Sequence, residues 1–448
     1  MKCLIIAAGR GSRLRQKGDC KPLVPILGIA LIERVIRTAM EAGADEFYVV
    51  IGHHGEQVRR FLERLASRLA VRITPLVNDA WDKENGLSVY KARDILHEPF
   101  LLLMADHLFD PDLVRPLTAL ALGDGEIALV VDGNIRNPLI DIEDVTRVKV
   151  EDDSPTCGRK IRDIGKGLAD FNGFDTGIFL CSPAIFEAVE QSQQKDGDAT
   201  LSGAVRILAA QGRAKAITME GFWIDVDDPK AFEKAEQALL KRLRDKPNDG
   251  PVARYLNRPL SVRMSRYLVQ RNVTPNQISL VSFLCSLLAA GLFATGGYFA
   301  LFVGGVLAQF ASVIDGCDGE VARLKYQSSD FGGWFDAVLD RYADAFLLFG
   351  LTWHLLVAKF NGWVLLVGFM AIIGSFMLSY TADKYDNLMR KRIQAGGKAG
   401  LRMGRDVRVF LIFVGAITNM VLPVLVLIAV VMNLETLRRV SIARHGQH

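Results

Sequence analysis

The stretch Asp315-Gly-Cys-Asp318-Gly-Glu-Val-Ala-Arg323, followed by Gly332-x3-Asp336-x3-Asp340, lies between two apolar runs, 298–314 and 345–358. Ionisable groups at membrane depth are costly and are usually kept for handling ions or substrates. On helices, Asp315 and Asp318 share one face, and so do Asp336 and Asp340. Two such faces meeting across a turn predict a cage of hard oxygen ligands suited to Mg²⁺ or Mn²⁺. The pattern therefore indicates a site that handles a diphosphate.

Long apolar runs dominate the chain from residue 278 to residue 432. The 448 residues, 50% of them hydrophobic, are too many for one ordinary domain. Several runs are shorter than the roughly 20 apolar residues of a full membrane span. A buried soluble hairpin is the alternative to membrane helices. We expect a six-helix transmembrane domain with spans at 278–294, 298–314, 335–358, 363–380, 407–418 and 421–432.

Arginine and lysine gather on one side of these spans: before the first, between the second and third, between the fourth and fifth, and after the sixth. The positive-inside rule then predicts a multi-pass protein of the cell membrane, with both termini and the aspartates on the cytoplasmic side. Residues 251–271 predict an amphipathic helix on the inner leaflet, with an ordinary linker as the alternative. The expected domains are 1–245, a linker at 246–272, and 273–448.

Residues 1–245 alternate apolar and charged segments as a soluble α/β domain with a Rossmann-like mixed sheet does. An apolar strand at 4–8 runs into the turn Gly9-Arg-Gly11-Ser-Arg13, whose consecutive N–H groups suit an anion. No GxxxxGK[ST] motif is present, which disfavours a P-loop ATPase. The net charge of +4 and the lack of a basic–aromatic patch argue against nucleic acid, and the six scattered cysteines predict reduced thiols.

The spacing D-x2-D-G-x2-A-R-x8-G-x3-D-x3-D resembles, at every defined position, the signature of the CDP-alcohol phosphotransferase family. Members move a substituted phosphate from a CDP-linked donor to an alcohol and release CMP. The resemblance implies divalent ions on the four aspartates, Asp340 as general base, and a homodimer through the membrane helices. For Asn276 and Arg323, a helix start and a simple ion pair are the alternatives. The implied nucleotide contacts are Asn276, Gly319, Ala322, Arg323 and Gly332.

The glycine turn, followed by Lys21-Pro22-Leu-Val-Pro25, resembles nucleotidyltransferases that join a nucleoside triphosphate to a sugar or polyol phosphate. The resemblance implies that Lys21 stabilises charge on the α-phosphate. It also implies that Asp106 binds a metal, with Asp225 as the first choice for the second ligand and Asp227 as the alternative. The residues implied to hold the triphosphate are Ala8, Gly9, Gly11 and Arg13.

Other positions of the soluble half carry weaker signals. Asn78, Asn85 and Ser88 resemble a base-reading loop, and Lys166 resembles an acceptor-phosphate ligand, but turn residues chosen for backbone geometry explain them equally well. Asp228 is expected to cap the next helix. The adjacent His53 and His54 are interpreted as structural.

The basic run from Lys384 to Arg408 is denser than the positive-inside rule needs. Lys384, Arg402, Arg405 and Arg408 are therefore candidates to bind an acceptor such as inositol phosphate, with attraction to anionic lipid as the alternative.

The whole chain resembles a family that fuses an inositol-1-phosphate cytidylyltransferase to a CDP-alcohol phosphotransferase. Such an enzyme would make CDP-inositol from CTP and inositol-1-phosphate. It would then transfer inositol phosphate to a second inositol-1-phosphate, forming a solute precursor. Transfer to a lipid alcohol, and a non-catalytic membrane nucleotide sensor or transporter, are the alternatives.

Overall fold

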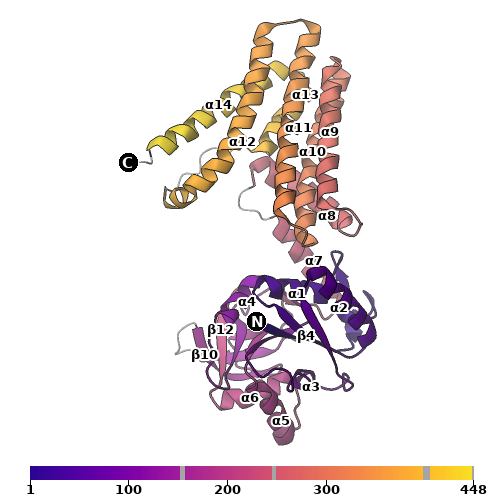
Figure 1. The fold of residues 1–448 in the computed structure, drawn as a ribbon, viewed down its shortest axis with the longest axis vertical. Coiled ribbons are helices and arrows are strands. Elements are labelled where there is room, and N and C mark those ends of the chain that lie inside the picture. Colours follow the sequence, from indigo (N-terminus) through magenta and orange to yellow (C-terminus); the bar gives the residue numbers. More distant parts are fainter. Residues whose placement is uncertain (152–156, 245–248, 397–403, 446–448) are drawn as a thin grey trace. The chain divides into compact units, whose positions relative to one another are not determined.

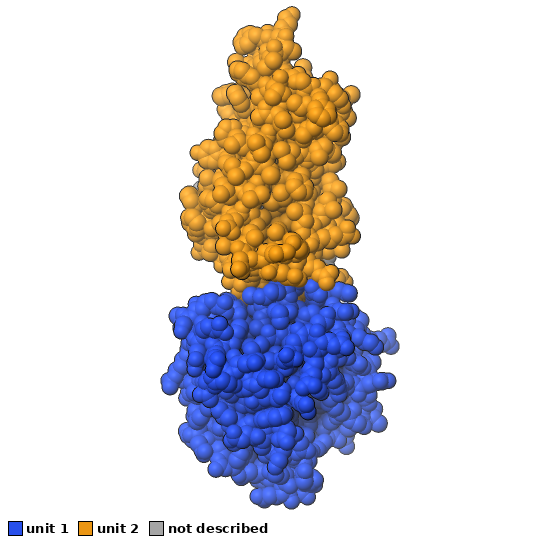
Figure 2. Space-filling model, turned by 90° about the vertical axis from the view of Figure 1, so that its right-hand side faces the viewer, with its two compact units in different colours: residues 1–238 blue, residues 239–448 orange. Residues whose placement is uncertain are grey.

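The computed structural model describes residues 1–151, 157–244, 249–396 and 404–445. These divide into two compact units, Met1–Ala238 and Leu239–His448 (Figure 2). Each unit is described by itself below.

The first unit is built on a mixed sheet of nine strands in the order β5-β4-β1-β6-β11-β8-β12-β10-β9. Strands β5, β4, β1 and β6 are parallel, whereas β11 runs antiparallel to both of its neighbours β6 and β8. The strands are β1 (Lys2–Ala7), β4 (Glu46–Ile51), β5 (Arg72–Val77), β6 (Phe100–Met104), β8 (Ile127–Asp132), β9 (Arg147–Val150), β10 (Cys157–Gly165), β11 (Gly173–Cys181) and β12 (Ala214–Met219).

Helices cover both faces of this sheet (Figure 1). Successive side chains of β1 point to opposite faces of the sheet, so Cys3 and Ile5 lie in one core and Leu4 lies in the other. The sheet therefore has a hydrophobic core on each face. The first core packs α1, α2 and α4, and the second packs α3, α5 and α6. The helices are α1 (Leu31–Glu41), α2 (Gly55–Leu69), α3 (Asn85–Tyr90), α4 (Pro111–Thr118), α5 (Ala184–Asp196), α6 (Leu201–Ala210) and α7 (Pro229–Arg244).

Short elements at the ends of the long strands build the first site. A two-stranded antiparallel sheet of β7 (His107–Phe109) and β13 (Trp223–Asp225) pairs His107 with Asp225. The 3-10 helices η1 (Ser12–Leu14) and η2 (Lys21–Leu23) follow the glycine turn. A two-residue pairing of β2 (Pro25–Ile26) with β3 (Ile29–Ala30) leads into α1.

The second unit is helical, and every predicted membrane segment is a helix. Most helices are longer than predicted, because the charged ends of the apolar runs remain helical. The aspartate motif thus lies within α10 and α11 and not in turns at their ends. The helices are η3 (Ala253–Asn257, a π-helix), α8 (Arg258–Leu268), α9 (Pro275–Ala294), α10 (Tyr298–Leu324), α11 (Asp330–Ala358), α12 (Gly362–Gly396), α13 (Arg405–Ile417) and α14 (Val421–His445).

Four segments of the described residues are long and apolar enough to cross a membrane: Pro275–Ala294, Tyr298–Leu324, Gly362–Ala382 and Val421–Ser441. Helix α11 falls outside this set because its first half carries charged side chains. Helix α13 falls outside it because it has only 13 residues. The second unit therefore has four candidate spans by composition.

Small residues let the helices approach closely. A Cβ added at Gly350 on α11 would meet Ala290 O on α9 at 2.6 Å, and one at Gly305 on α10 would meet Ala416 Cβ on α13 at 2.7 Å. Close backbone contact at small residues is the usual packing mode of helices in lipid. Helix α9 begins with a capping box from Thr274 and Gln277, with Pro275 in its first turn.

Candidate active sites

The glycine turn after β1 is held against Lys21. Gly11 has φ +59°, and a Cβ added there would collide with the Lys21 side chain. Only glycine fits such a conformation and such an approach. The Lys21 side chain is 9% exposed, and its Nζ lies 2.6 Å from Asp106 Oδ2 and also contacts Asp227 Oδ1. The turn, the lysine and two of the predicted metal carboxylates therefore form one cluster.

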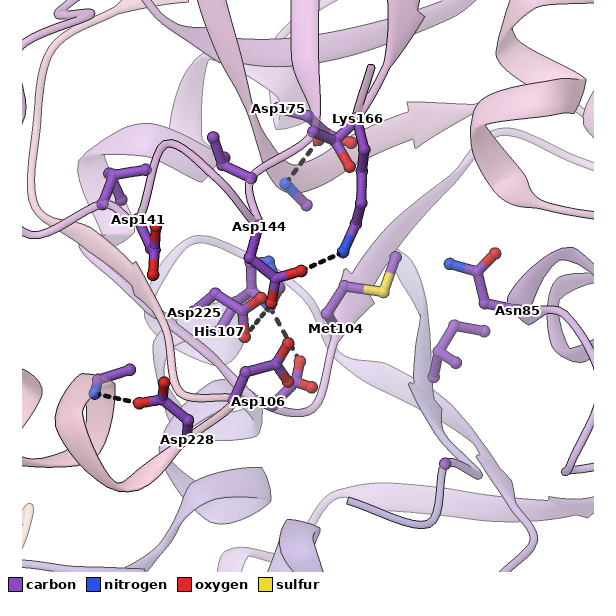
Figure 3. Close-up of a pocket in the computed structure, with 18 of the residues that line it drawn as sticks. Asn85, Met104, Asp106, His107, Asp141, Asp144, Lys166, Asp175, Asp225 and Asp228 are labelled. Atoms are coloured by element: carbon purple, nitrogen blue, oxygen red, sulfur yellow. Dashed lines mark hydrogen bonds and ion pairs between the residues drawn. The ribbon is translucent and has the colours of Figure 1, made fainter. Parts of the chain in front are cut away.

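Asp106, His107 and Asp225 bring one ligand atom each within 4.8 Å of one another. Figure 3 shows the three side chains converging. His107 Nδ1 lies 2.9 Å from Asp106 Oδ1 and 3.7 Å from Asp225 Oδ1. No role was predicted for His107 from the sequence. Its position beside Asp106 at a strand end was the available signal.

Opposite charges set the protonation states in this cluster. Burial opposes the charged form of Lys21, but Asp106 and Asp227 outweigh it and raise the pKa of the amine. Burial likewise opposes the His107 cation, yet Asp225 and Asp106 raise its pKa to about 9. Burial raises the pKa of the Asp225 carboxyl, and nearby Asp106 and Asp227 add to this effect. A further cation beside Asp225 would favour its ionised form.

Two adjoining cavities open on the cluster. The larger, of about 400 Å³, contains Asp106, Asp225 and Lys166, together with the predicted base-reading residues Asn85 and Ser88. The smaller, of about 280 Å³, contains Gly9, Gly11, Arg13 and Lys21. Asp106 and Asp227 line both. The cavity at the glycine turn thus adjoins a pocket of ordinary ligand size.

Asn78 stabilises neighbouring residues through hydrogen bonds. Its buried amide donates to Ser88 Oγ at 3.0 Å and accepts from the Ala80 N–H at 3.1 Å, and it is not among the residues that line the cavities. Asn85 Oδ1 accepts from the Leu201 N–H at 2.9 Å. His53 and His54 pack on each other, and His53 lies against Trp81. Asp228 accepts from the Ala231 N–H at 2.7 Å, which confirms its capping role.

Asp144 joins two predicted substrate-binding cations that are far apart in the sequence. Its carboxylate contacts Arg13 and lies 2.7 Å from Lys166 Nζ (Figure 3). Asp175, at the wall of the larger cavity, accepts from the Gly177 N–H at 2.8 Å. Burial raises its pKa to about 6. No role was predicted for either acid from the sequence, because no motif distinguishes them from other acidic residues.

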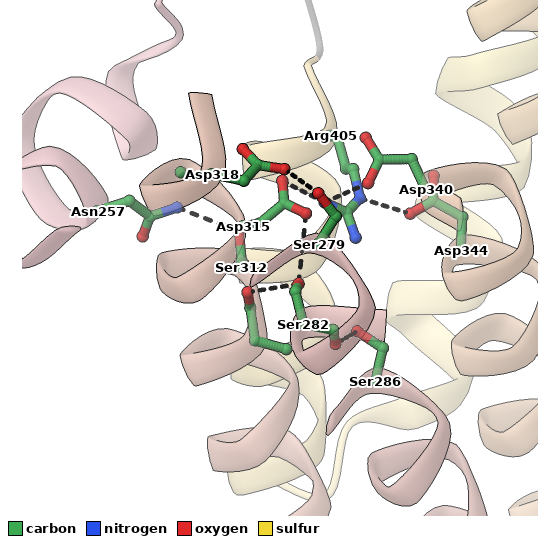
Figure 4. Close-up of polar contacts among 12 residues, drawn as sticks. Asn257, Ser279, Ser282, Ser286, Ser312, Asp315, Asp318, Asp340, Asp344 and Arg405 are labelled. Atoms are coloured by element: carbon green, nitrogen blue, oxygen red, sulfur yellow. Dashed lines mark hydrogen bonds and ion pairs between the residues drawn. The ribbon is translucent and has the colours of Figure 1, made fainter. Parts of the chain in front are cut away.

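In the second unit, carboxylate oxygens of Asp315, Asp336 and Asp340 lie within 4.8 Å of one another. Arg405 Nη1 lies 2.7 Å from Asp315 Oδ2 and 2.8 Å from Asp340 Oδ1 (Figure 4). Asp318 accepts from Ser279 Oγ on α9 at 2.5 Å. The two predicted helix faces therefore meet, with Asp318 at the edge of the group.

A cavity of about 170 Å³ adjoins these acids. It is lined by every residue that the sequence implied to contact the nucleotide in this half, and by two of the aspartates. These residues are Asn276, Gly319, Ala322, Arg323, Gly332, Asp318 and Asp336.

Arg405 and Arg408, two of the predicted acceptor-binding residues, both form ion pairs with Asp344. Arg408 Nη2 is 2.6 Å and Arg405 Nε 3.4 Å from the Asp344 carboxylate, to which Ser375 also donates at 3.0 Å. Asp344 continues the Asp336-x3-Asp340 spacing by one more step, a signal that the sequence analysis did not use. The Lys384 side chain and all of Arg402 lie outside the described residues.

Comparisons with known proteins match both halves of the chain. The family description "MobA-like NTP transferase domain" matches residues 3–202, and "CDP-alcohol phosphatidyltransferase" matches residues 272–440. The "Bifunctional IPC transferase and DIPP synthase" of Rubrobacter xylanophilus is 35% identical over 454 residues, covering 99% of this chain and 96% of the relative. The Aquifex aeolicus protein of the same name is 33% identical over 441 residues, with 97% and 96% covered.

A solved structure titled as the inositol-1-phosphate CTP transferase from T. maritima matches 52% of this chain and 94% of its own, with 24% identity and a TM-score of 0.45.

The fold, the sites and the two family matches define an enzyme with a nucleotidyltransferase domain and a CDP-alcohol phosphotransferase domain in one membrane protein. The chain belongs to the family of bifunctional IPC transferases and DIPP synthases. Both family resemblances predicted from the sequence are thereby confirmed.

Proposed function

We propose that residues 1–245 make CDP-inositol and pyrophosphate from CTP and inositol-1-phosphate. Residues 273–448 then transfer the inositol phosphate group to a second inositol-1-phosphate and release CMP, and residues 246–272 form the linker and the juxtamembrane helix. The observation that carries this proposal is the pairing, in each unit, of a carboxylate cluster with an adjoining cavity. The names of the full-length relatives support the choice of inositol substrates.

The first cluster fits a divalent cation. Asp225 Oδ1 is buried and has no hydrogen-bond partner among the described residues, although it faces Asp106 and His107. Hard carboxylate oxygens in such an arrangement suit Mg²⁺ or Mn²⁺. Asp106 and Asp225 would hold the ion, which neutralises phosphate charge when bound. We retain Asp227 as the second choice, because it already pairs with Lys21.

Different residues of the first unit bind different parts of the triphosphate. The turn at Ala8–Gly11 directs N–H groups at phosphate oxygens, and Arg13 adds a cation at the mouth of the smaller cavity. Lys21 stabilises the charge that develops on the α-phosphate. Lys166 orients the phosphate of inositol-1-phosphate, whose oxygen forms the new bond to the α-phosphorus as pyrophosphate leaves.

The second cluster also fits a divalent cation. Asp315, Asp336 and Asp340 present only carboxylate oxygens, and Arg405 lies 2.7 Å from Asp315 and 2.8 Å from Asp340. These acids, with Asp318, would hold one or two ions that stabilise the charge on the diphosphate and the CMP leaving group. Arg323, Asn276 and the Gly319 backbone line the adjoining cavity, where the cytidine nucleotide would lie.

Phosphotransfer in the second unit requires a general base and a bound acceptor. Asp340 takes the proton of the acceptor hydroxyl, whose oxygen then bonds to the phosphorus that CMP leaves. Arg405 and Arg408 bind the acceptor phosphate through paired N–H donors. Lys384 and Arg402 are retained as further acceptor ligands on the sequence pattern alone.

Six membrane spans, cytoplasmic termini and sites, and a homodimer through the membrane helices complete the proposal. The distribution of basic residues supports the orientation. Large apolar side chains are exposed along the helices of the second unit, including Phe299, Phe310 and Trp353, as a lipid-facing surface requires. Helix α8 exposes Leu260 and Tyr267 beside arginines, which suits the inner leaflet.

One experiment tests both halves. Full-length protein in detergent is given CTP, Mg²⁺ and labelled inositol-1-phosphate, and products are identified by mass. We expect CDP-inositol and a water-soluble phosphorylated di-inositol phosphodiester. Asp106→Asn should abolish the first product, and Asp340→Asn should abolish the second while CDP-inositol accumulates.

The alternatives give different results in the same assay. A labelled product that forms only with added lipid alcohol and partitions into organic solvent would indicate a phospholipid synthase. Nucleotide binding without any turnover would indicate a sensor or transporter.

A further inference from the structure

Glu320 is a fully buried carboxylate on α10 that takes no part in the diphosphate site. Its exposed fraction is zero, and it lies between Gly319 and the cavity residue Ala322 in the sequence. Such a group is costly to bury unless every acceptor oxygen has a donor. The donors all come from the juxtamembrane helix α8.

Three side chains of α8 satisfy Glu320. Arg258 Nη1 lies 2.7 Å from Oε1, Ser261 Oγ donates to the same oxygen at 2.6 Å, and Ser265 Oγ donates to Oε2 at 2.7 Å. Arg258 is 11% exposed and also makes a bidentate contact with Asp249 in the linker, at 2.7 and 3.2 Å. The linker and α10 are therefore joined by a buried ionic chain, Asp249–Arg258–Glu320.

Further polar contacts extend this junction along α10. Asn257 donates to Ser312 Oγ at 3.1 Å and accepts from Gln309 Nε2 at 2.8 Å (Figure 4 shows the Ser312 contact). Arg258 Nη1 reaches Gly316 O at 3.5 Å. The positions 309, 312, 316 and 320 follow helical spacing and form one stripe on α10.

The aspartates lie on a different face of the same helix. Asp315 and Asp318 accept hydrogen bonds from α9, at Ser282 (3.3 Å) and Ser279 (2.5 Å). The side-chain hydrogen bonds given for the stripe go to Asn257 of η3 and to Arg258, Ser261 and Ser265 of α8. Helix α10 is therefore held on two sides, and its rotation and its position along its axis fix where the aspartate oxygens lie.

Apolar replacements of a buried ion pair are often at least as stable as the pair, so the pair is better explained by specificity of geometry than by stability. We propose that Glu320 and Arg258 are positioning residues of the phosphotransfer centre, which clamp α10 in the register that brings Asp315 and Asp318 to the diphosphate. The proposal rests on the function proposed for that site.

The test uses the dependence of phosphotransfer on Mg²⁺, because misplaced ligands weaken metal binding whereas a mere loss of folded protein does not. Full-length protein in detergent receives CDP-inositol and inositol-1-phosphate, and CMP release is followed against Mg²⁺ concentration. For Glu320→Gln we expect the Mg²⁺ concentration at half-maximal rate to rise about tenfold, as for other residues that orient metal ligands. CDP-inositol synthesis by the same preparation should be unchanged.

Two further variants keep the test decisive. Ser265→Ala removes one donor but keeps the Arg258–Glu320 pair, and it should shift the Mg²⁺ curve in the same direction by a smaller factor. Glu435→Gln is the matched control, since Glu435 on α14 pairs only with its near neighbours Arg438 and Arg439 in the contacts described. Its Mg²⁺ curve should match that of the unmodified protein.

Each result has one meaning. A wild-type Mg²⁺ curve in both Glu320→Gln and Ser265→Ala, or in Ser265→Ala alone if Glu320→Gln does not fold, overturns the clamp. A lower maximal rate with an unmoved curve also overturns it, because that result reports a loss of folded protein only. If unmodified protein releases no CMP from CDP-inositol, the proposed function itself fails.

Discussion

Arg405 donates to Asp340 across the second site, with 2.8 Å between Nη1 and Oδ1. The same nitrogen lies 2.7 Å from Asp315 Oδ2, so one guanidinium bridges the proposed base and a proposed metal ligand. An acceptor phosphate that binds Arg405 would compete with these carboxylates and leave Asp340 free to take a proton. On the proposed roles, acceptor binding and base activation would be linked through a single side chain.

Arg405→Gln should raise the KM for inositol-1-phosphate in the phosphotransfer step by about tenfold or more, because a charge-assisted hydrogen bond is worth about 1.5–3 kcal/mol. The measurement is CMP release at varied inositol-1-phosphate with CDP-inositol fixed. Arg438→Gln, which alters an exposed arginine on α14, serves as the control. An unchanged KM would remove Arg405 from the acceptor pocket.

Lys21→Met should lower the rate of cytidylyl transfer by about 10²–10³-fold, the usual effect of removing a donor aimed at developing negative charge. Pyrophosphate release from CTP and inositol-1-phosphate measures it, and phosphotransfer from supplied CDP-inositol should persist. Lys195→Met changes an exposed lysine of α5 and should have no effect. If Lys21→Met transferred the cytidylyl group at a rate near that of the unmodified protein, the role assigned to Lys21 would be contradicted.

Asp225→Asn and Asp227→Asn should separate the two candidate ligands. Asp225 has a buried oxygen without a hydrogen-bond partner in the described structure, whereas Asp227 already contacts Lys21 and lies 4.0 Å from Arg13. We expect Asp225→Asn to weaken Mn²⁺ activation of CDP-inositol synthesis by about tenfold or more and Asp227→Asn to weaken it less. The opposite order would make Asp227 the ligand.

Asp175→Asn should stabilise the protein at alkaline pH. Burial raises the pKa of Asp175 from its ordinary value of 3.8 to about 6, so the native chain binds more protons than the unfolded chain between these values. The free energy of unfolding therefore falls as pH rises through this window and stays lower above it. The asparagine keeps an acceptor for the Gly177 N–H but does not titrate.

The comparison needs thermal unfolding of both proteins in detergent at two pH values. The variant should have the higher Tm at about pH 8, and the two values should converge at about pH 4, where the native carboxyl is protonated. A Tm difference that is the same at both pH values would contradict the shifted pKa.

Much of the second site could be predicted from the sequence because its ligands are local. Asp315, Asp318, Asp336 and Asp340 lie on two consecutive helices joined by a short turn, so helical spacing alone brings their faces together. Asn276, at the start of α9, was implied by the family resemblance and not by spacing, and it lines the same cavity as Asp318 and Asp336. The helix bounds were predicted less well, since apolar runs mark only the lipid-facing parts of helices that continue beyond them.

The first site depended on resemblance, because its parts are distant in the chain. Lys21 meets Asp227 across 206 positions, and Asp144 meets Arg13 across 131. No periodicity or spacing relates such pairs. Parallel and antiparallel strands around β1 and β6 bring these loops to one edge of the sheet, and that arrangement exists only in the folded chain.

The sequence by itself determined the aspartate motif, the apolar helices and the glycine turn, because each is a pattern within one or two neighbouring elements whose backbone geometry is known. The tertiary structure alone decided that Arg405 bridges Asp315 and Asp340, that Asp144 joins Arg13 to Lys166, and that Arg258 pairs with buried Glu320. These contacts depend on how separate helices and loops pack. Packing is set by the summed burial of many side chains and not by any local pattern of residues.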